Sequence, residues 1–199
     1  FVQRALDLGL LSNNQVDQVW REVGSAHRAE LADAENAVLR KEFMTNFQVD
    51  RMKKGERLGY FYGKYKVLYL VGAGTFARVY RAEHIDTGKV YALKVLRRRY
   101  SDDIETTDQF LREAKLVMTL RHPNIVPIYD LGSNRDGALF YSMKEVKGTP
   151  WMNVITDRTL HGNLDVLLKV SDAVAFAHSK GVIHRDLKPE NIMLGEFGE

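Results

Sequence analysis

The stretch that decides the fold is His184-Arg185-Asp186-Leu187-Lys188-Pro189-Glu190-Asn191. It concentrates charged side chains in a short segment whose backbone is restricted by Pro189. A helix is predicted just before it, at about residues 164–180, with Gly181 placed as the C-terminal cap. Solvated loops also carry charges, but this order of residues is very improbable by chance. It is the most specific pattern in the chain.

A glycine-rich loop lies upstream, at Gly72-Ala73-Gly74-Thr75-Phe76-Ala77. Glycines let the backbone approach a phosphate and direct N–H groups toward it. A dinucleotide-binding loop would lead from a strand into a helix, whereas residues 78–82 have the composition of a second strand. A glycine-loop hairpin therefore fits better, and by itself the pattern is equally compatible with an ordinary hairpin.

Lys94 alternates with apolar neighbours in Tyr91-Ala92-Leu93-Lys94-Val95. If it points inward, burial of its ammonium requires an anionic partner. Glu113, on the following predicted helix, could be that partner, and so could a nucleotide phosphate. Taken alone, Lys94 could equally be an exposed lysine on an edge strand.

The order of the predicted strands and helices indicates the fold class. β-Branched and aromatic content predicts strands at residues 65–71, 77–84, 90–96, 126–131 and 138–144. Apolar spacing predicts one inserted helix at about 106–120. An antiparallel sheet with one inserted helix, followed by a helical region, is an α+β arrangement and not alternating βαβ.

Together these elements resemble the eukaryotic-like serine/threonine protein kinases over residues 65–199. The resemblance implies a protein-kinase-like two-lobed fold. Its small lobe would span residues 65–146, with a five-stranded sheet and one helix, and the large lobe would begin at 147–199. It also implies transfer of the ATP γ-phosphoryl group to Ser or Thr hydroxyls of a protein substrate, with ATP and Mg²⁺ as cofactors.

The resemblance implies roles for the glycine loop and the residues after it. Gly72 and Gly74 resemble the first two glycines of the phosphate-covering loop, and Ala77 replaces the third. Lys94 and Glu113 resemble the lysine that holds the phosphates and its helix partner. The full set implied to contact ATP is Val71, Gly72, Ala73, Gly74, Thr75, Phe76, Val79, Ala92, Lys94, Glu113, Met143, Lys144, Val146 and Met193.

Within this set, Met143 resembles the gatekeeper, and the backbone of Lys144 and Val146 would face adenine. In the opening stretch, the resemblance implies that Asp186 is the catalytic base and that Lys188 steadies the γ-phosphate. It also implies that Asn191 is a magnesium ligand. The alternative is a pseudokinase or nucleotide-binding scaffold, which the presence of all these side chains disfavours.

Residues 1–57 are predicted to be a helical module joined by a linker at 58–64. Ser12 with Gln15, and Thr45 with Gln48, repeat the capping-box spacing of a helix N-terminus. Two helical hairpins are favoured over a solenoid, which needs more repeats. The segment resembles the helical prefix of planctomycete-type bacterial kinases, and we expect it to be an interaction module without which the kinase core still folds.

Composition limits the remaining classes of function. Hydrophobic residues make up 45% and charged residues 28% of the 199 residues, the net charge is +3, and there is no cysteine. Disulfides and zinc-thiolate sites are therefore excluded, and a reducing, cytoplasmic location fits. No apolar run is long enough to span a bilayer, and no long basic block indicates a nucleic-acid partner.

Glu196-Phe197-Gly198 differs from the Asp-Phe-Gly metal-binding tripeptide of kinases by one carboxylate homologue. The family's tripeptide is expected about 18 residues after the catalytic Asp, which counted from Asp186 lies past residue 199. Glu196 is only 10 residues after Asp186. We therefore expect it to be a turn carboxylate with no metal role. We also expect a chain truncated before the true tripeptide, with negligible phosphotransfer of its own.

Overall fold

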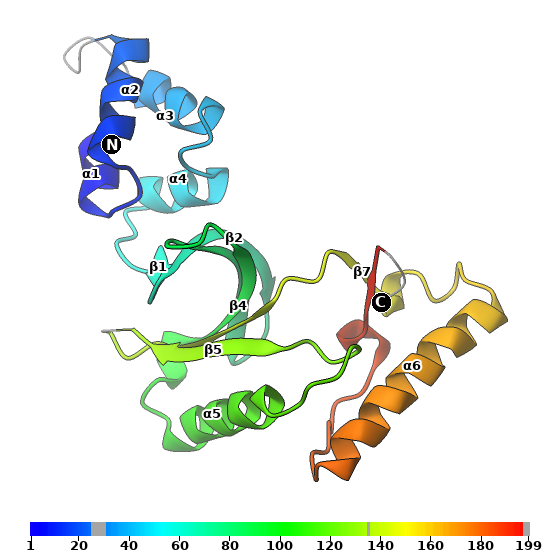
Figure 1. Ribbon diagram of the computed structural model, residues 1–199. Helices are drawn as coiled ribbons and strands as arrows, with labels where there is room; N and C mark the ends of the chain where they lie inside the picture. The colour runs from blue at the N-terminus through cyan, green and yellow to red at the C-terminus, as the bar shows by residue number, and fades with distance from the viewer. Residues whose placement is uncertain (25–30, 135, 197–199) are drawn as a thin grey trace.

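The computed structural model describes residues 1–24, 31–134 and 136–196. A group of N-terminal helices lies to one side of an antiparallel sheet, with the inserted helix on the other side (Figure 1). The N-terminal helices bury apolar residues in a common core, to which Val2, Val19, Val38 and Met52 contribute. These helices are α1 (Val2–Asp7), α2 (Asn13–Val23), α3 (Leu31–Arg40) and α4 (Asn46–Lys53).

Both predicted capping boxes are confirmed. The Ser12 hydroxyl accepts the Gln15 N–H at 3.3 Å, and the Gln15 carboxamide oxygen accepts the Ser12 N–H at 2.8 Å. Thr45 and Gln48 repeat both bonds at 3.3 and 2.9 Å. These side chains satisfy backbone donors that a helix N-terminus otherwise leaves free.

The sheet is antiparallel throughout, in the order β1-β2-β3-β4-β6-β5. Two predicted strands are confirmed residue for residue, and the others are shifted or extended by one to two residues. The strands are β1 (Phe61–Tyr62), β2 (Tyr65–Ala73), β3 (Ala77–His84), β4 (Val90–Leu96), β5 (Ile128–Ser133) and β6 (Leu139–Lys144). β5 begins after Pro127, which has no N–H to donate to a sheet.

The five strands predicted within residues 65–146 are present as β2 to β6, and the described sheet has a sixth strand outside that range. The additional strand, β1, comes from the expected linker at 58–64 and pairs Phe61 with Lys66 and Tyr62 with Tyr65. Two residues are too few to show the period-two alternation by which a strand is found in a sequence.

The N-terminal helices contact the sheet directly through α4. The register of β2 shifts between Val67 and Tyr69, and α4 binds the carbonyl groups at this irregularity. Gln48 Nε2 donates to Val67 O at 2.6 Å, and Thr45 Oγ1 donates to Leu68 O at 2.7 Å. Phe47 also packs against the core of the sheet.

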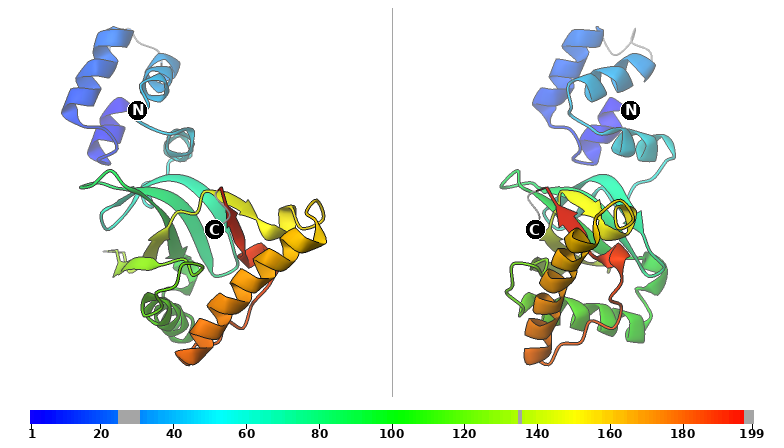
Figure 2. Two further views of the ribbon diagram at one scale, coloured as in Figure 1. Left: turned by 45° about the vertical axis from the view of Figure 1, so that its right-hand side comes forward. Right: turned by 90° about the vertical axis from the view of Figure 1, so that its right-hand side faces the viewer.

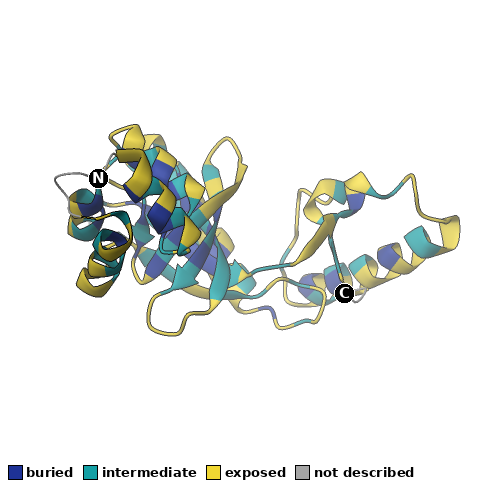
Figure 3. Cartoon of the chain, turned by 90° about the horizontal axis from the view of Figure 1, so that it is seen from above, coloured by how far each residue is buried: buried dark blue, intermediate teal, exposed yellow. Residues whose placement is uncertain are grey.

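The two longest described helices lie outside the sheet. α5 (Ile104–Met118) packs against one face of the sheet, and α6 (Leu160–Ser179) extends beside it (Figure 2). α6 begins four residues before the predicted start, because Thr159 accepts the Gly162 N–H at 3.1 Å. Buried residues concentrate in the sheet and the N-terminal helices, whereas α6 is largely exposed (Figure 3).

Short elements complete the described chain. A two-stranded sheet joins β7 (Gly148–Pro150) to β8 (Met193–Gly195), and single 3₁₀ turns lie at Arg98–Tyr100, Trp151–Asn153 and Pro189–Asn191. Glu196 is exposed in the turn after β8, as expected, while the Phe197 and Gly198 of that predicted turn lie outside the described residues. No described helix is both long and apolar enough to cross a bilayer.

Candidate active site

The glycine-rich segment forms the predicted hairpin between β2 and β3. Gly72 pairs with Val79 and Ala73 with Arg78, and the Gly74 N–H donates to Ala77 O at 2.9 Å to close the turn. Nothing lies within 4 Å of a Cβ built on Gly72, so the loop leaves open space above its backbone. A ligand could approach the main chain closely there.

Lys94 is not a solvent-facing edge lysine. Its Nζ lies 2.7 Å from Glu113 Oε1, so β4 and α5 are joined by an ion pair. Tyr141 on β6 donates its hydroxyl to the same Glu113 oxygen at 2.8 Å, and Lys94 Nζ lies 5.4 Å from the centre of the Tyr141 ring. Sequence reasoning missed Tyr141, although its register opposite Lys94 places it on the same face.

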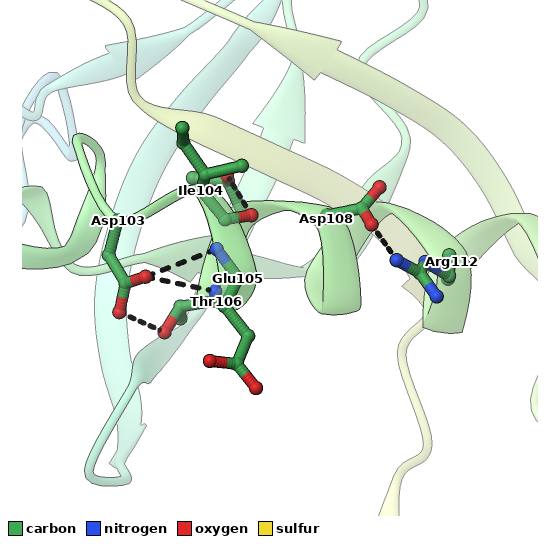
Figure 4. Close-up of polar contacts among 7 residues, drawn as sticks. Asp103, Ile104, Glu105, Thr106, Asp108 and Arg112 are labelled. Carbon is green, nitrogen blue, oxygen red and sulfur yellow. Dashed lines mark hydrogen bonds and ion pairs between the residues drawn. The ribbon is translucent and has the colours of Figure 1, made fainter.

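The start of α5 fixes the helix that carries Glu113. Asp103 caps it, with Oδ1 accepting the N–H groups of Glu105 and Thr106 at 3.1 and 3.4 Å and Oδ2 accepting the Thr106 hydroxyl at 2.7 Å (Figure 4). These bonds lower the pKa of Asp103, those from Thr106 most strongly, so the cap is anionic at neutral pH. One turn on, Asp108 and Arg112 form an ion pair on the helix surface.

The environment of Glu113 keeps it charged. Burial alone would raise the pKa of this carboxyl, but the hydrogen bond and charge of Lys94, the Tyr141 hydroxyl and the charge of His184 together lower it. Burial and the nearby Glu113 raise the pKa of Tyr141, which therefore stays protonated as a donor.

The strand register gathers the side chains expected around adenine. Val79 is opposite Lys94 on β4, and Ala92 is opposite Met143 on β6, which places all four side chains on one face of the sheet. Val79, Ala92 and Met143 are half-buried, whereas Val71 is 66% exposed at the rim.

The last residue of β6 and the segment after it carry the two backbone positions expected to face adenine. Lys144 N–H already donates to Pro127 O at 3.1 Å. Val146 N–H has no hydrogen-bond acceptor among the described residues and is available to a ligand. Between them, Glu145 binds Arg81 Nε at 2.6 Å, a link from β3 that sequence reasoning did not predict.

Met193 lies on β8, which pairs with β7 in a two-stranded sheet separate from the main one. Pro150 is opposite Met193, and the Trp151 N–H donates to Ile192 O at 2.8 Å. A Cβ on Gly148 would lie 2.1 Å from Leu194 O. Only glycine permits this approach, since real Cβ contacts are never so short.

The catalytic stretch holds its three predicted residues together. Asn191 Nδ2 donates to the backbone oxygen and the Oδ2 of Asp186 at 2.8 and 2.9 Å, and Lys188 Nζ lies 3.0 Å from Asp186 Oδ1. Arg185 has a φ of +64°, a conformation uncommon for a residue with a side chain. Such strain is typical of functional loops.

These contacts also set the charge of the loop. Hydrogen bonds from Lys188 and then from Asn191 lower the pKa of Asp186, so its carboxylate is ionised at neutral pH and can accept a proton or hydrogen bond. The Asn191 amide nitrogen is committed to Asp186, which leaves its carboxamide oxygen free for a cation. Among the described residues no group of three or more His, Cys, Asp or Glu is placed to hold a metal.

Comparison with known proteins agrees with this geometry. Residues 65–199 match the family model described as the protein kinase domain. Over 135 residues the chain is 42% identical to the serine/threonine-protein kinase pkn3 of Myxococcus xanthus, covering 66% of this chain and 24% of that protein. It is 39% identical to PrkC of Bacillus subtilis, covering 68% of this chain and 21% of the relative.

Solved structures extend the similarity to the fold. A crystal structure of the Mycobacterium tuberculosis PknI kinase domain superposes with a TM-score of 0.60 at 29% identity, covering 70% of this chain and 59% of that one. The chain thus spans about a quarter of the curated relatives' length and over half of the solved domain. The kinase-like α+β fold agrees with the family match, and through residues 65–199 this chain belongs to the protein kinase domain family.

Proposed function

We propose that this chain provides the nucleotide-binding and catalytic-loop portion of a serine/threonine protein kinase that phosphorylates Ser or Thr hydroxyls of protein substrates. The observation that carries the proposal is the Lys94–Glu113 ion pair, at 2.7 Å, on the face of the sheet that continues into the glycine loop. Phosphoryl transfer depends on positioning and charge stabilisation more than on covalent chemistry.

The residues present fit ATP. The Gly72–Ala77 loop supplies an open backbone for phosphates, and Lys94 supplies a cation fixed by Glu113. Half-buried Val79, Ala92, Met143 and Met193 supply apolar walls for an adenine ring. The free Val146 N–H is a donor for a ring nitrogen. We assign ATP contacts to these residues and to the remaining ones named from the family resemblance.

The catalytic loop fits the transfer step. Asp186 is held as a carboxylate by Lys188 and Asn191, and we assign it to accept the proton of the substrate hydroxyl. Lys188 supplies positive charge near the transferred group. The free oxygen of Asn191 is of the type that Mg²⁺ prefers, and a bound Mg²⁺ would neutralise charge on the phosphates.

Several finer assignments belong to the same proposal. The bacterial relatives support a bacterial kinase, and we propose the planctomycete type from the sequence resemblance of residues 1–57. We propose a cytoplasmic site of action, where ATP is available, no nucleic-acid partner, and a regulatory partner for the N-terminal helices. Residues 65–146 would form the small lobe and residues 147–199 the start of the large lobe.

The test is transfer of labelled γ-phosphate from ATP to a Ser/Thr-containing protein by the full-length protein. Asp186→Asn should lower the rate by about 10²-fold or more, because positioned proton transfer contributes that much. Asp165→Asn, an exposed change on α6, is the matched control and should leave the rate unchanged. Equal rates for Asp186→Asn and the unaltered protein would refute the role of Asp186 and favour a nucleotide-binding scaffold.

A further inference from the structure

A hollow of about 420 Å³ lies away from the candidate active site, on the opposite face of the sheet. Val95 lines it, and its neighbour Lys94 therefore points to the other face. Its walls come from α4, from the segment before β1 and the last residue of β1, from β3, from β4 and the residues after it, and from the turn before β6. Figures 1 and 2 show the N-terminal helices close to this side of the sheet.

The lining of this hollow is strongly basic. It includes Arg51 of α4, Arg78 of β3 and the consecutive Arg97, Arg98 and Arg99 after β4. Asp136 is the acidic residue among its described lining residues, and Glu56, nearby, pairs with Arg51. Guanidinium groups gathered from separate elements repel one another unless an anion lies between them.

In two of these guanidinium groups the Nε atom lacks an acceptor. The Nε atoms of Arg51 and Arg97 are both buried, and neither has a hydrogen-bond partner among the described residues. A buried donor without a partner is costly, and each such group in a folded protein calls for an explanation. Both arginines line the hollow, where a bound oxyanion would offer acceptors to their guanidinium groups.

Arg51 is held rigidly in place before any ligand arrives. One of its terminal nitrogens donates to Leu58 O at 2.7 Å, and its guanidinium lies 5.5 Å from the ring centres of both Phe47 and Tyr60. Because the group is already ordered, little side-chain entropy would be lost on binding.

Gly59 keeps the wall beside Arg51 open. Its φ is +80°, and a Cβ there would lie 2.8 Å from a terminal nitrogen of Arg51 and 3.4 Å from the Tyr62 hydroxyl. Burial raises the pKa of Tyr62 to about 12, so at neutral pH its hydroxyl is a neutral donor. The hollow thus presents several donors and few acceptors.

We propose that this hollow is a binding site for a phosphate-type oxyanion, either free or carried as a phosphate monoester. Planar guanidinium groups match phosphate oxygens with paired hydrogen bonds, and arginines from separate elements can surround a dianion. The hollow is larger than one phosphate group needs and lies in the volume range of small-molecule sites. An ester with a further organic portion therefore fits it better than the free ion.

The proposed site lies between the N-terminal helices and the sheet. Arg51 belongs to the N-terminal helices and Arg78 to the sheet, so one ligand would connect both parts. The same basic segment contacts the glycine loop, since the Arg97 N–H donates to Phe76 O at 2.8 Å and Arg99 donates to Thr75 O at 3.1 Å. A ligand in the hollow would therefore fix Arg97 and Arg99, and through their hydrogen bonds it would restrain the glycine loop.

The test is calorimetric titration of the whole chain with inorganic phosphate and with O-phosphothreonine. We expect saturable binding by at least one probe, weakened about tenfold or more in Arg78→Gln and in Arg97→Gln, because charge-assisted hydrogen bonds are lost. Arg112→Gln removes an equal charge from the surface of α5 and should leave the affinity unchanged. Tighter binding of phosphothreonine would identify the ester as the ligand, and equal affinities would identify the phosphate group alone.

Lys94→Met separates this site from the proposed nucleotide site. The affinity for phosphate should be unchanged in Lys94→Met. It should fall in Arg98→Gln, which alters an exposed residue and can replace Arg97→Gln if that variant does not fold. The proposal would be overturned if no saturable binding were seen up to about 10 mM probe, because a dissociation constant above that concentration is too weak for a functional site. So would affinities that are lost in Lys94→Met and retained in the arginine variants, which would place the anion at the nucleotide site.

Discussion

Gln48→Ala is the change that best tests how the N-terminal helices are coupled to the kinase lobe. Gln48 is 1% exposed, and its side chain makes two bonds at once. Its oxygen accepts the Thr45 N–H at 2.9 Å to complete a capping box, and its nitrogen donates to Val67 O at 2.6 Å. Gln15 is a natural control, because it makes the equivalent capping bond to Ser12 at 2.8 Å but is not buried and has no bond to the sheet.

The expected difference follows from the second bond. Loss of the capping contact should cost each variant about 0.5–1 kcal/mol of unfolding free energy. Gln48→Ala also leaves the buried Val67 carbonyl without its partner, which adds about 1–3 kcal/mol. For a chain of this size each kcal/mol lowers the melting temperature by about 2–4 °C, so Gln48→Ala should melt at least about 2 °C below Gln15→Ala.

Thermal unfolding followed by circular dichroism, with urea unfolding as a second measure, determines both shifts. A single cooperative transition that moves further for Gln48→Ala is the expected result. If the two variants melt at the same temperature, or if Gln48→Ala splits the transition while the main melting temperature stays fixed, the α4–β2 contact does not stabilise the lobe. The helices would then be the independent module that the sequence predicts.

Three further predictions follow from the site. Gly148→Ala should lower the unfolding free energy by about 1–3 kcal/mol because its Cβ would clash with Leu194 O; an unchanged melting temperature would mean that β7 tolerates displacement. The pKa of Glu113 is below its usual 4.5, so its pairing with Lys94 stabilises the fold above that pH and is lost as pH falls through the lowered value. Urea unfolding at several pH values should therefore show the deficit of Glu113→Gln shrinking in acid, and a constant deficit would contradict this. Tyr141→Phe removes a hydrogen bond to Glu113 and should raise the pKa of that carboxyl in an NMR titration, whereas an unchanged pKa would refute the contact.

The sequence was sufficient to predict most of the lobe. Strands were predictable where side chains alternate over several residues, as in Ala77–His84 and Val90–Leu96. The Lys94–Glu113 pair was also anticipated, because burying an ammonium requires an anion. The starts of α2 and α4 were predictable as well, because in each capping box the Ser or Thr and its Gln partner lie only three residues apart in the sequence.

What the sequence could not predict depends on contacts between distant segments. The two-residue β1 has no detectable period, and the bond from Gln48 to β2 requires knowing where the sheet irregularity lies. Tyr141 joins Glu113 only through the pairing of β4 with β6, and Arg81 meets Glu145 only across the sheet. The basic hollow likewise combines α4 with strands far along the chain.

The central claim is that the Lys94–Glu113 pair forms part of a working phosphoryl-transfer site. Its most direct test is incorporation of labelled γ-phosphate into a Ser/Thr protein substrate by full-length protein carrying Lys94→Met. Lys64→Met is the matched control, because Lys64 is also paired, with Asp86 at 2.6 Å, but lies at the exposed end of the sheet. We predict that Lys94→Met abolishes incorporation while Lys64→Met retains it. Equal incorporation by both variants would contradict the account.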